Sequence, residues 1–330
     1  MRLPRNQVLV GDASDRLLQL PADSVDCVIT SPPYYRLRNY GHAAQLGAEP
    51  HVDDWVAALR LVMRGVARVL KSTGTAWLNL GDTYSRRASA GAPPKSLLLA
   101  PERLALALLD DGWTVRNKIV WTKTNPMPAS VADRLTTTWE PILLLSRSRH
   151  YFFDLDAIRA PHTGRRRGPM SVPASVSRPR WAGPGAGSNN GLARLRRNGH
   201  AGHPLGKNPG DTWRTSTSSY QSSHPATYPE QLIRPAVLAG CPERTCASCG
   251  VPQPTPIGLE PCSCATVATH PGIVLDPFLG SGSTAAAAKR AGRDWLGIEL
   301  NPEYAALAEQ RLAATPNPNV DGQTESAHAA

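Results

Sequence analysis

The alternation of short apolar strands with helices along the first 150 residues is the feature that most constrains this fold. Runs of β-branched and other apolar residues that stop at turn residues predict strands at 6–10, 25–30, 75–80, 114–121 and 141–146. Apolar residues at helical spacing predict helices at 14–20, with Ser14 as the cap, at 55–70 and at 97–109. The alternation returns in helices at 229–239, 284–291 and 303–312 and in strands at 273–275 and 295–300. Such alternation is typical of an α/β fold with a doubly wound, mostly parallel sheet.

Between these regions, the segment 157–211 lacks hydrophobic periodicity and carries the positive charge of the chain. It holds ten basic residues and no acidic one between Ala157 and Gly210, while the whole chain has a net charge of +10. Positive charge concentrated in one segment favours a polyanion, such as nucleic acid, as the binding partner. The alternative is a solvated, partly disordered basic loop, which its glycines and prolines would also produce. The candidate DNA-binding residues are Arg165, Arg166, Arg167, Arg178, Arg180, Trp181, Arg194, Arg196 and Arg197.

Length and hydrophobicity exclude several classes of protein. A chain of 330 residues is long enough for one large or two ordinary domains without disulfide staples. No stretch approaches the roughly 18 uninterrupted apolar residues of a membrane span. The first residues, MRLPRNQVLVGD, lack the apolar core of a signal peptide. The sequence therefore predicts a soluble, cytoplasmic protein without a membrane partner, and its pattern leaves the oligomeric state open.

A glycine-rich turn, DPFLGSGST at 276–284, follows a predicted strand and opens a helix. Backbone N–H groups at a helix start, beside glycines without a Cβ atom, can approach a ligand closely. Glu299 ends the next strand, 17 residues after Gly282, where a carboxylate can accept hydrogen bonds from two ribose hydroxyls. Ser283 and Thr284 replace the third glycine of the dinucleotide fingerprint, and the Walker lysine is missing, which disfavours NAD and nucleoside triphosphates. The pattern predicts a nucleoside-bearing cofactor; the alternative is a turn that needs glycine for geometry alone.

A second turn, TSPPYY at 30–35, ends another predicted strand, where open α/β sheets place their active sites. Its two prolines fix the backbone, so the Ser31 hydroxyl and the Pro32 carbonyl can be directed at one point as acceptors beside the ring of Tyr34. Two acceptors and a stacking surface are what is needed to hold an exocyclic base amine. The alternative is a surface Pro-Pro turn with a core tyrosine.

Five of the six cysteines lie close together near residue 250. They include two pairs, Cys246-x₂-Cys249 and Cys262-x-Cys264, separated by 12 residues. This spacing suits a tetrahedral zinc ribbon, and four thiolates leave no open coordination position, which predicts a structural zinc ion. Cys241 and His270 are further candidate ligands. The alternative is a reduced, metal-free loop of incidental cysteines.

Taken in order, these motifs resemble those of the amino-methylating DNA methyltransferases, which modify N4 of cytosine or N6 of adenine, in the permuted arrangement with the Ser-Pro-Pro-Tyr half first. The resemblance is carried by VLVGDASDRLLQLPADSVDCVITSPPYY, NKIVWTKTNPMPASVADR, HPATYPEQLIRPAVLAG, IVLDPFLGSGST and WLGIELNPEYAALAEQRL. Only the basic segment and the cysteines stand outside it. The resemblance implies S-adenosylmethionine as cofactor, a seven-stranded methyltransferase sheet and a flipped base in double-stranded DNA as substrate.

The resemblance also implies roles for individual residues. The catalytic turn is Ser31, Pro32, Pro33 and Tyr34, with Tyr34 as the stacking surface. The cofactor-binding residues are Asp12, Asp276, Phe278, Gly280, Gly282, Ser283, Thr284 and Glu299, with Tyr228 and Pro229 from an additional cofactor motif. A serine that opens the turn resembles the N4-cytosine enzymes, so N4 of cytosine is predicted and N6 of adenine is the alternative. A nucleic-acid-binding or RNA-modifying relative that kept the fold is the alternative from another class.

The expected organisation follows from these assignments. Residues 1–156 form the catalytic half, 157–211 the target-recognition segment, 212–240 the additional cofactor motif with its helix, 241–270 the zinc insertion, 271–314 the cofactor half and 315–330 a disordered tail. The expected partner is double-stranded DNA, and the sequence leaves open whether the protein has a cognate restriction endonuclease or acts alone. The expected location is the cytoplasm, in association with the nucleoid. The expected source is a prokaryote or a phage.

Overall fold

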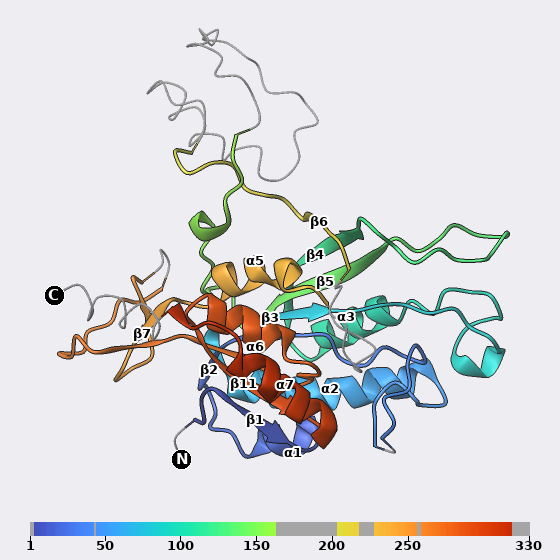
Figure 1. The fold of residues 1–330 in the computed structure, drawn as a ribbon, viewed down its shortest axis with the longest axis horizontal. Helices are drawn as coiled ribbons and strands as arrows, with labels where there is room; N and C mark the ends of the chain where they lie inside the picture. Colours follow the sequence, from blue (N-terminus) through green and yellow to red (C-terminus); the bar gives the residue numbers. More distant parts are fainter. Residues whose placement is uncertain (1–2, 43, 163–202, 218–227, 256–258, 319–330) are drawn as a thin grey trace, which may run out of the picture. The chain divides into compact units, whose positions relative to one another are not determined.

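One mixed sheet of eight strands organises the larger of two compact units in this computed structural model, which describes residues 3–42, 44–162, 203–217, 228–255 and 259–318. The strand order is β1-β11-β10-β2-β3-β5-β4-β6 (Figure 1). The strands are β1 (Gln7–Val10), β2 (Val25–Thr30), β3 (Leu70–Asn79), β4 (Thr114–Lys123), β5 (Trp139–Ser146), β6 (Thr212–Thr215), β10 (Ile273–Asp276) and β11 (Asp294–Glu299). All neighbouring pairs are parallel except those of β5 with β3 and β4. The prediction of a mostly parallel α/β sheet is confirmed.

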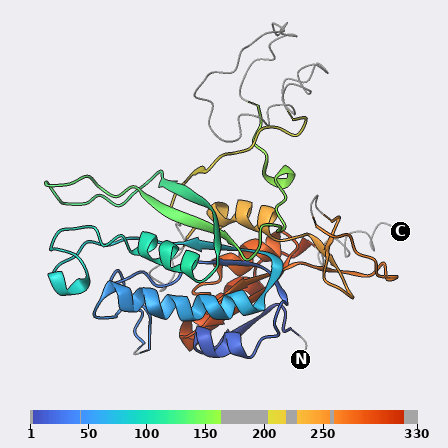
Figure 2. The same cartoon turned by 180° about the vertical axis from the view of Figure 1, so that it is seen from behind.

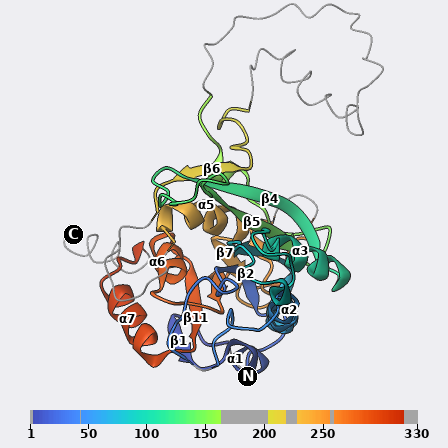
Figure 3. The ribbon, with the colours of Figure 1, turned by 90° about the vertical axis from the view of Figure 1, so that its right-hand side faces the viewer.

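Helices cover both faces of this sheet. The helices α1 (Ala13–Leu18), α2 (Val52–Val69) and α3 (Ala100–Asp110) pack on one face of the sheet. Figure 2 shows these helices from the side opposite to that of Figure 1. The helices α5 (Glu230–Gly240), α6 (Ser283–Arg290) and α7 (Pro302–Ala313) pack on the other, and Figure 3 shows both layers end on. Each face has its own apolar core, with Trp55 and Leu104 in the first and Val237 and Ala286 in the second. This is the doubly wound arrangement that the alternation predicts.

Three details of the fold differ from the prediction. Helix α1 is capped by Asp12, not by Ser14, because Asp12 Oδ1 accepts the backbone N–H of Ser14 at 2.8 Å and that of Asp15 at 3.2 Å. The described sheet has eight strands instead of seven, because β6 adds to β4 in parallel, with Val120 opposite Thr212. A second sheet of three short strands, which the sequence pattern does not predict, forms around the cysteines.

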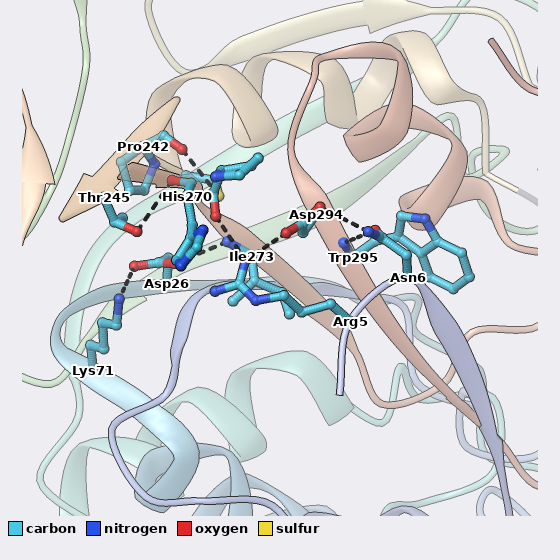
Figure 4. Close-up of polar contacts among 12 residues, drawn as sticks. Arg5, Asn6, Asp26, Lys71, Pro242, Thr245, His270, Ile273, Asp294 and Trp295 are labelled. Atoms are coloured by element: carbon cyan, nitrogen blue, oxygen red, sulfur yellow. Dashed lines mark hydrogen bonds and ion pairs between the residues drawn. The ribbon is translucent and has the colours of Figure 1, made fainter. Parts of the chain in front are cut away.

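This cysteine-bearing sheet consists of β7 (Arg244–Cys246), β8 (Pro252–Gln253) and β9 (Thr269–Pro271). Lys71, at the start of β3, links the loop between β7 and β8 to the amino end of β2 (Figure 4). The buried Asp26 carboxylate accepts hydrogen bonds from Lys71 Nζ at 2.6 Å and from the backbone N–H of Ile273 at 2.9 Å. Lys71 Nζ also donates to the Gly250 carbonyl at 3.1 Å. The cysteines are therefore fastened at the edge of the sheet opposite the carboxyl ends of its strands.

The strand order reverses between β2 and β10. From β10 the chain continues to β11 on one side, whereas from β2 it continues to β3 on the other. The two following loops therefore diverge, and open α/β sheets bind their ligands in the crevice that forms at such a point. Both motifs singled out in the sequence follow these two strands, the Ser31 to Tyr34 turn after β2 and the Asp276 to Thr284 turn after β10.

The smaller unit, Leu155–Gly210, is described only at its two ends. There the 3₁₀ helix η2 (Asp156–Ile158) precedes an antiparallel bridge between Ala160 and Lys207. Arg159 Nε contacts Asp156 Oδ1 at 2.5 Å within the same turn. In the described part of both units, none of the helices has the length and apolarity needed to cross a membrane.

Candidate active site

A cavity of about 420 Å³ lies at the carboxyl ends of β2, β10 and β11 and brings the two motifs together. Its walls include predicted site residues from distant parts of the sequence: Asp12, Ser31, Pro32, Pro33, Tyr34, Tyr228, Phe278, Gly280, Ser283 and Glu299. Four other predicted residues, Asp276, Gly282, Thr284 and Pro229, do not line it. The structure therefore separates the candidates into those that face the cavity and those that lie behind its wall.

Asp276 lies behind the wall, at the end of β10, with 1% of its surface exposed. Its carboxylate accepts hydrogen bonds from the Thr30 hydroxyl at 2.6 Å, the Phe278 backbone N–H at 3.0 Å and the Tyr228 hydroxyl at 3.3 Å, and also from Thr284. Burial raises the pKa of Asp276, and these donors oppose that rise. Asp276 thus joins the ends of β2 and β10 and fixes the turn beside the cavity.

Glu299 faces the cavity from the end of β11. Its Oε2 accepts the backbone N–H of Gly280 at 2.8 Å, and its Oε1 accepts that of Asn301 at 2.9 Å. Burial raises the pKa of this carboxyl group, with the two N–H donors acting in the opposite direction. Each carboxylate oxygen has a further lone-pair site, so Glu299 can hold both loops and still accept from ligand hydroxyls.

The glycine turn needs its glycines for backbone conformation. Gly280 and Gly282 have φ values of +52° and +81°, in the left-handed region that side chains disfavour. A Cβ atom on Gly282 would also lie 3.2 Å from Ala308 Cβ. Gly282 is the residue that precedes α6. In the same way, Pro229 precedes α5 and Asp12 caps α1, so both stand at helix starts.

The Ser31 to Tyr34 turn presents its groups to the same cavity. The Ser31 hydroxyl donates to the Tyr34 hydroxyl at 3.1 Å. The Pro33 carbonyl accepts from the indole N–H of the buried Trp55 at 2.9 Å, which ties the turn to α2. The ring of Tyr34 packs closely on the end of β3, because a Cβ atom on Gly81 would come within 2.4 Å of two ring carbons. The turn is therefore held on both sides.

Three polar residues that the sequence motifs did not identify surround the Tyr34 hydroxyl or its acceptor. Glu140 Oε2, on β5, accepts from this hydroxyl at 2.8 Å and from Asn79 Nδ2, at the end of β3, at 2.7 Å. Asn79 Nδ2 also donates to the Tyr34 oxygen. Lys123 is the last residue of β4, and its Nζ pairs with Glu140 Oε1. Glu140 and Lys123 line the cavity with side-chain exposures of 14% and 20%.

Comparison with known proteins identifies the family. A family model described as DNA methylase, covering N6 and N4 enzymes, matches residues 25–310. The chain belongs to this DNA methylase family. It is 34% identical over 328 residues to the type II methyltransferase M.SmaI of Serratia marcescens, a match that covers 93% of this chain and 90% of that protein. The methylase is accordingly an S-adenosylmethionine-dependent DNA methyltransferase of the restriction–modification type.

Two other comparisons concern the base and the fold. The methylase is 26% identical over 311 residues to the DNA adenine methyltransferase YhdJ of Escherichia coli (strain K12), over 92% of this chain and 82% of that protein. Among solved structures, the cytosine-N4-specific PvuII DNA methyltransferase has a TM-score of 0.59 at 18% identity, over 94% of this chain and 86% of that one. At this identity, the structural match shows a shared fold.

The four cysteines of the two predicted pairs converge in the methylase. The Sγ atoms of Cys246, Cys249, Cys262 and Cys264 all lie within 4.8 Å of one another. Cys241 and His270 are not part of this group; Cys241 is buried with its thiol against the Pro242 carbonyl. Backbone N–H groups of Cys249 and Ser248 lower the pKa of Cys246 to about 6. The group therefore has the donor atoms and spacing of a four-thiolate metal site.

The nine residues of the methylase predicted to contact DNA lie outside the described residues. They are Arg165, Arg166, Arg167, Arg178, Arg180, Trp181, Arg194, Arg196 and Arg197. Their role in binding DNA stays a prediction.

Proposed function

We propose that this methylase transfers the methyl group of S-adenosylmethionine to N4 of cytosine in duplex DNA. The observation that carries the proposal is that the Ser31 to Tyr34 turn and the Glu299 and Gly280 loop line one cavity. Glu299 fits a ribose because its carboxylate stays available for hydroxyl donors, and Phe278 and Tyr304 supply apolar surface in the same walls. When bound there, the cofactor supplies an electrophilic methyl group on its sulfonium.

The turn would do its work on the base amine, whose lone pair is conjugated with the ring and is a poor nucleophile. The Ser31 hydroxyl and the Pro32 carbonyl accept its two N–H groups, which favours a pyramidal nitrogen with a free lone pair. Tyr34 lies beside them as a surface for the flipped base. Most of the rate enhancement then comes from positioning and from fixed dipoles.

The choice of cytosine rests on Ser31, the neutral residue that opens the turn. The match to the cytosine-N4-specific PvuII enzyme shows the fold alone and does not decide the base. The similarity to an adenine methyltransferase from Escherichia coli makes N6 of adenine the second candidate.

The reaction product tests the proposal directly. Incubation of the purified protein with S-adenosylmethionine and unmethylated duplex DNA, followed by digestion to nucleosides and mass spectrometry, is expected to give N4-methylcytosine. The Ser31→Asp variant is expected to lose at least about 90% of the rate or to change the base, because a carboxylate replaces the neutral acceptor. N6-methyladenine from the wild type would overturn the choice of base, and DNA without a methylated base would overturn the proposed activity. A Ser31→Asp variant with unchanged rate and base would remove the role of Ser31.

We also propose that the four cysteines hold one structural zinc ion. A tetrahedral ion with Zn–S bonds of about 2.3 Å places its sulfurs about 3.8 Å apart, and Cys249 Sγ and Cys262 Sγ already lie 3.4 Å apart. The ion would close the loop that Lys71 ties to the core through Gly250.

Metal analysis of protein expressed with added zinc is expected to find about one zinc per chain. The Cys249→Ser and Cys262→Ser variants should lose most of it, because each removes one of four ligands. Cys241→Ala is the matched control, since this buried thiol is outside the group and its loss should leave the zinc content unchanged. Zinc-free wild-type protein under these conditions would contradict the site.

A further inference from the structure

A chain of hydrogen bonds leads from the reacting end of the cavity to a carboxylate. The Ser31 hydroxyl donates to the Tyr34 hydroxyl at 3.1 Å, and the Tyr34 hydroxyl donates to Glu140 Oε2 at 2.8 Å. Both hydroxyl protons therefore point toward Glu140. This direction leaves the lone pairs of Ser31 Oγ free to accept an N–H group from the cavity.

Surrounding groups hold this direction. Asn79 Nδ2 donates both to the Tyr34 oxygen and to Glu140 Oε2, so the only hydrogen that the tyrosine hydroxyl has to give goes to the carboxylate. Lys123 Nζ occupies the other carboxylate oxygen, Glu140 Oε1. The Glu140 carboxylate therefore pairs with a cation through one oxygen and accepts the tyrosine proton through the other.

Glu140 is singled out among the acids of the cavity. Three acidic residues in the described part of the chain line it: Asp12, Glu140 and Glu299. The carboxylate of Asp12 caps α1, and that of Glu299 accepts two backbone N–H groups on the cofactor side. Only Glu140 is hydrogen-bonded to the Ser31 to Tyr34 turn. The hydrogen-bonded route from Ser31 to a carboxylate therefore passes through Tyr34.

Methylation of an amine creates the need for such an acceptor. As the nitrogen lone pair forms a bond to the methyl carbon, the carbon–sulfur bond breaks and its electron pair stays on sulfur. The nitrogen then carries one proton and one positive charge too many. A serine hydroxyl cannot retain an added proton at neutral pH, so it has to pass one on.

We propose that Ser31, Tyr34 and Glu140 form a proton relay that removes this proton from the methylated amine, an inference that rests on the proposed amine methylation. Ser31 Oγ takes the proton from nitrogen and gives its own to the Tyr34 oxygen. Tyr34 gives its hydroxyl proton to Glu140 Oε2, which becomes a neutral carboxylic acid and later releases the proton to water. Each hydroxyl ends with one proton, and the positive charge of the amine is cancelled by the carboxylate charge.

The resting state of the tyrosine agrees with this role. Burial, followed by the charge of Glu140, raises the pKa of Tyr34 well above its usual value. The phenol therefore stays protonated at neutral pH and transmits a proton without being held as a phenolate.

Single-turnover methyl transfer in three variants tests the relay. Glu140→Gln removes the acceptor, Tyr34→Phe interrupts the route but keeps the ring and the pair of Glu140 with Lys123, and the third variant combines both. Each single change is expected to slow the step by about 100-fold, within the range of general acid–base catalysis. The double variant is expected to be no slower than the slower single one, because residues that act as a unit are not additive.

Equilibrium binding and rescue by a conservative variant separate the relay from a structural role. S-adenosylmethionine and DNA are expected to bind all three variants within about twofold of wild type, because the relay acts only after both are bound. Glu140→Asp keeps a carboxylate beside Tyr34, Asn79 and Lys123, whereas Glu140→Gln removes the proton acceptor at the same place. Glu140→Asp should therefore restore part of the rate that Glu140→Gln loses.

Glu102→Gln is the matched control. Glu102, on α3, pairs with Lys118 of β4, the strand that also carries Lys123, but this pair lies on the surface. Its single-turnover rate should equal that of wild type. Wild-type rates in Glu140→Gln or Tyr34→Phe, or losses that multiply in the double variant, would overturn the relay while the proposed function stands. A wild-type protein that methylates no base amine would overturn both.

Discussion

Replacement of Glu299 by alanine is expected to weaken S-adenosylmethionine binding by about 100-fold. A hydrogen bond to a charged group contributes about 1.5–3 kcal/mol, and about 2.7 kcal/mol corresponds to that factor. The variant would lose the assigned ribose acceptor and also the bonds that hold Gly280 and Asn301 at 2.8 and 2.9 Å. Isothermal titration calorimetry with S-adenosylmethionine alone measures the change without DNA or turnover.

Glu303→Ala is the matched control, because this acid lies four residues further along the chain, exposed on the first turn of α7. Its affinity for the cofactor should stay within about twofold of wild type, since an exposed carboxylate outside the cavity makes no assigned contact. If Glu299→Ala bound the cofactor as tightly as Glu303→Ala, the ribose assignment would be wrong.

Replacement of Asp26 by alanine is expected to lower the free energy of unfolding by about 3–5 kcal/mol. The carboxylate is 4% exposed and accepts from both Lys71 and the Ile273 backbone N–H (Figure 4). Its removal would leave an unpaired ammonium group, 18% exposed, and an unpaired N–H at the start of the central strand β10. Thermal unfolding followed by circular dichroism should show a drop of roughly 10 °C in Tm.

Two comparison variants make this result interpretable. Asp23→Ala breaks the pair of Asp23 with Arg147, but Asp23 is 62% exposed, so its effect should stay below about 1 kcal/mol. The double variant Asp26→Ala with Lys71→Ala should recover part of the loss, because it leaves no unpaired buried charge. An Asp26→Ala protein as stable as Asp23→Ala would show that the buried pair contributes little.

The main sheet was predictable because its strands have patterns of their own. The run from Val25 to Thr30 is mostly apolar, and it is buried along its whole length, as expected for a strand covered on both faces. The strands β7, β8 and β9 have two or three residues each, too few to show a period. These strands pair because of the path of the chain around the cysteines. In the sequence, only the spacing of the cysteine pairs points to this region.

The site residues that belong to sequence motifs could be predicted, whereas those brought to the site by the pairing register of the strands could not. The turns at Ser31 and Gly280 follow predicted strands, so both could be placed at one edge of the sheet. Glu140 lies inside β5 without a motif of its own. It approaches Lys123 because β4 and β5 pair antiparallel with Trp121 opposite Glu140. It approaches Asn79 and Tyr34 because β5 also pairs with β3, with Asn79 opposite Ile142. Asp276 carried a motif, but only the structure shows that its four partners lie within the protein.

The order of strands in the sheet also governs how the chain is built during translation. β1 and β2 are made first, yet β10 and β11 lie between them and are made almost last. Until β10 has been made, the backbone N–H and C=O groups on that edge of β2 have no partner strand. Sheet closure is therefore a late, long-range event, of the kind that is intrinsically slow and exposes unpaired strand edges to aggregation. The edge of β2 that receives β10 is therefore without its partner strand for most of the synthesis of the chain.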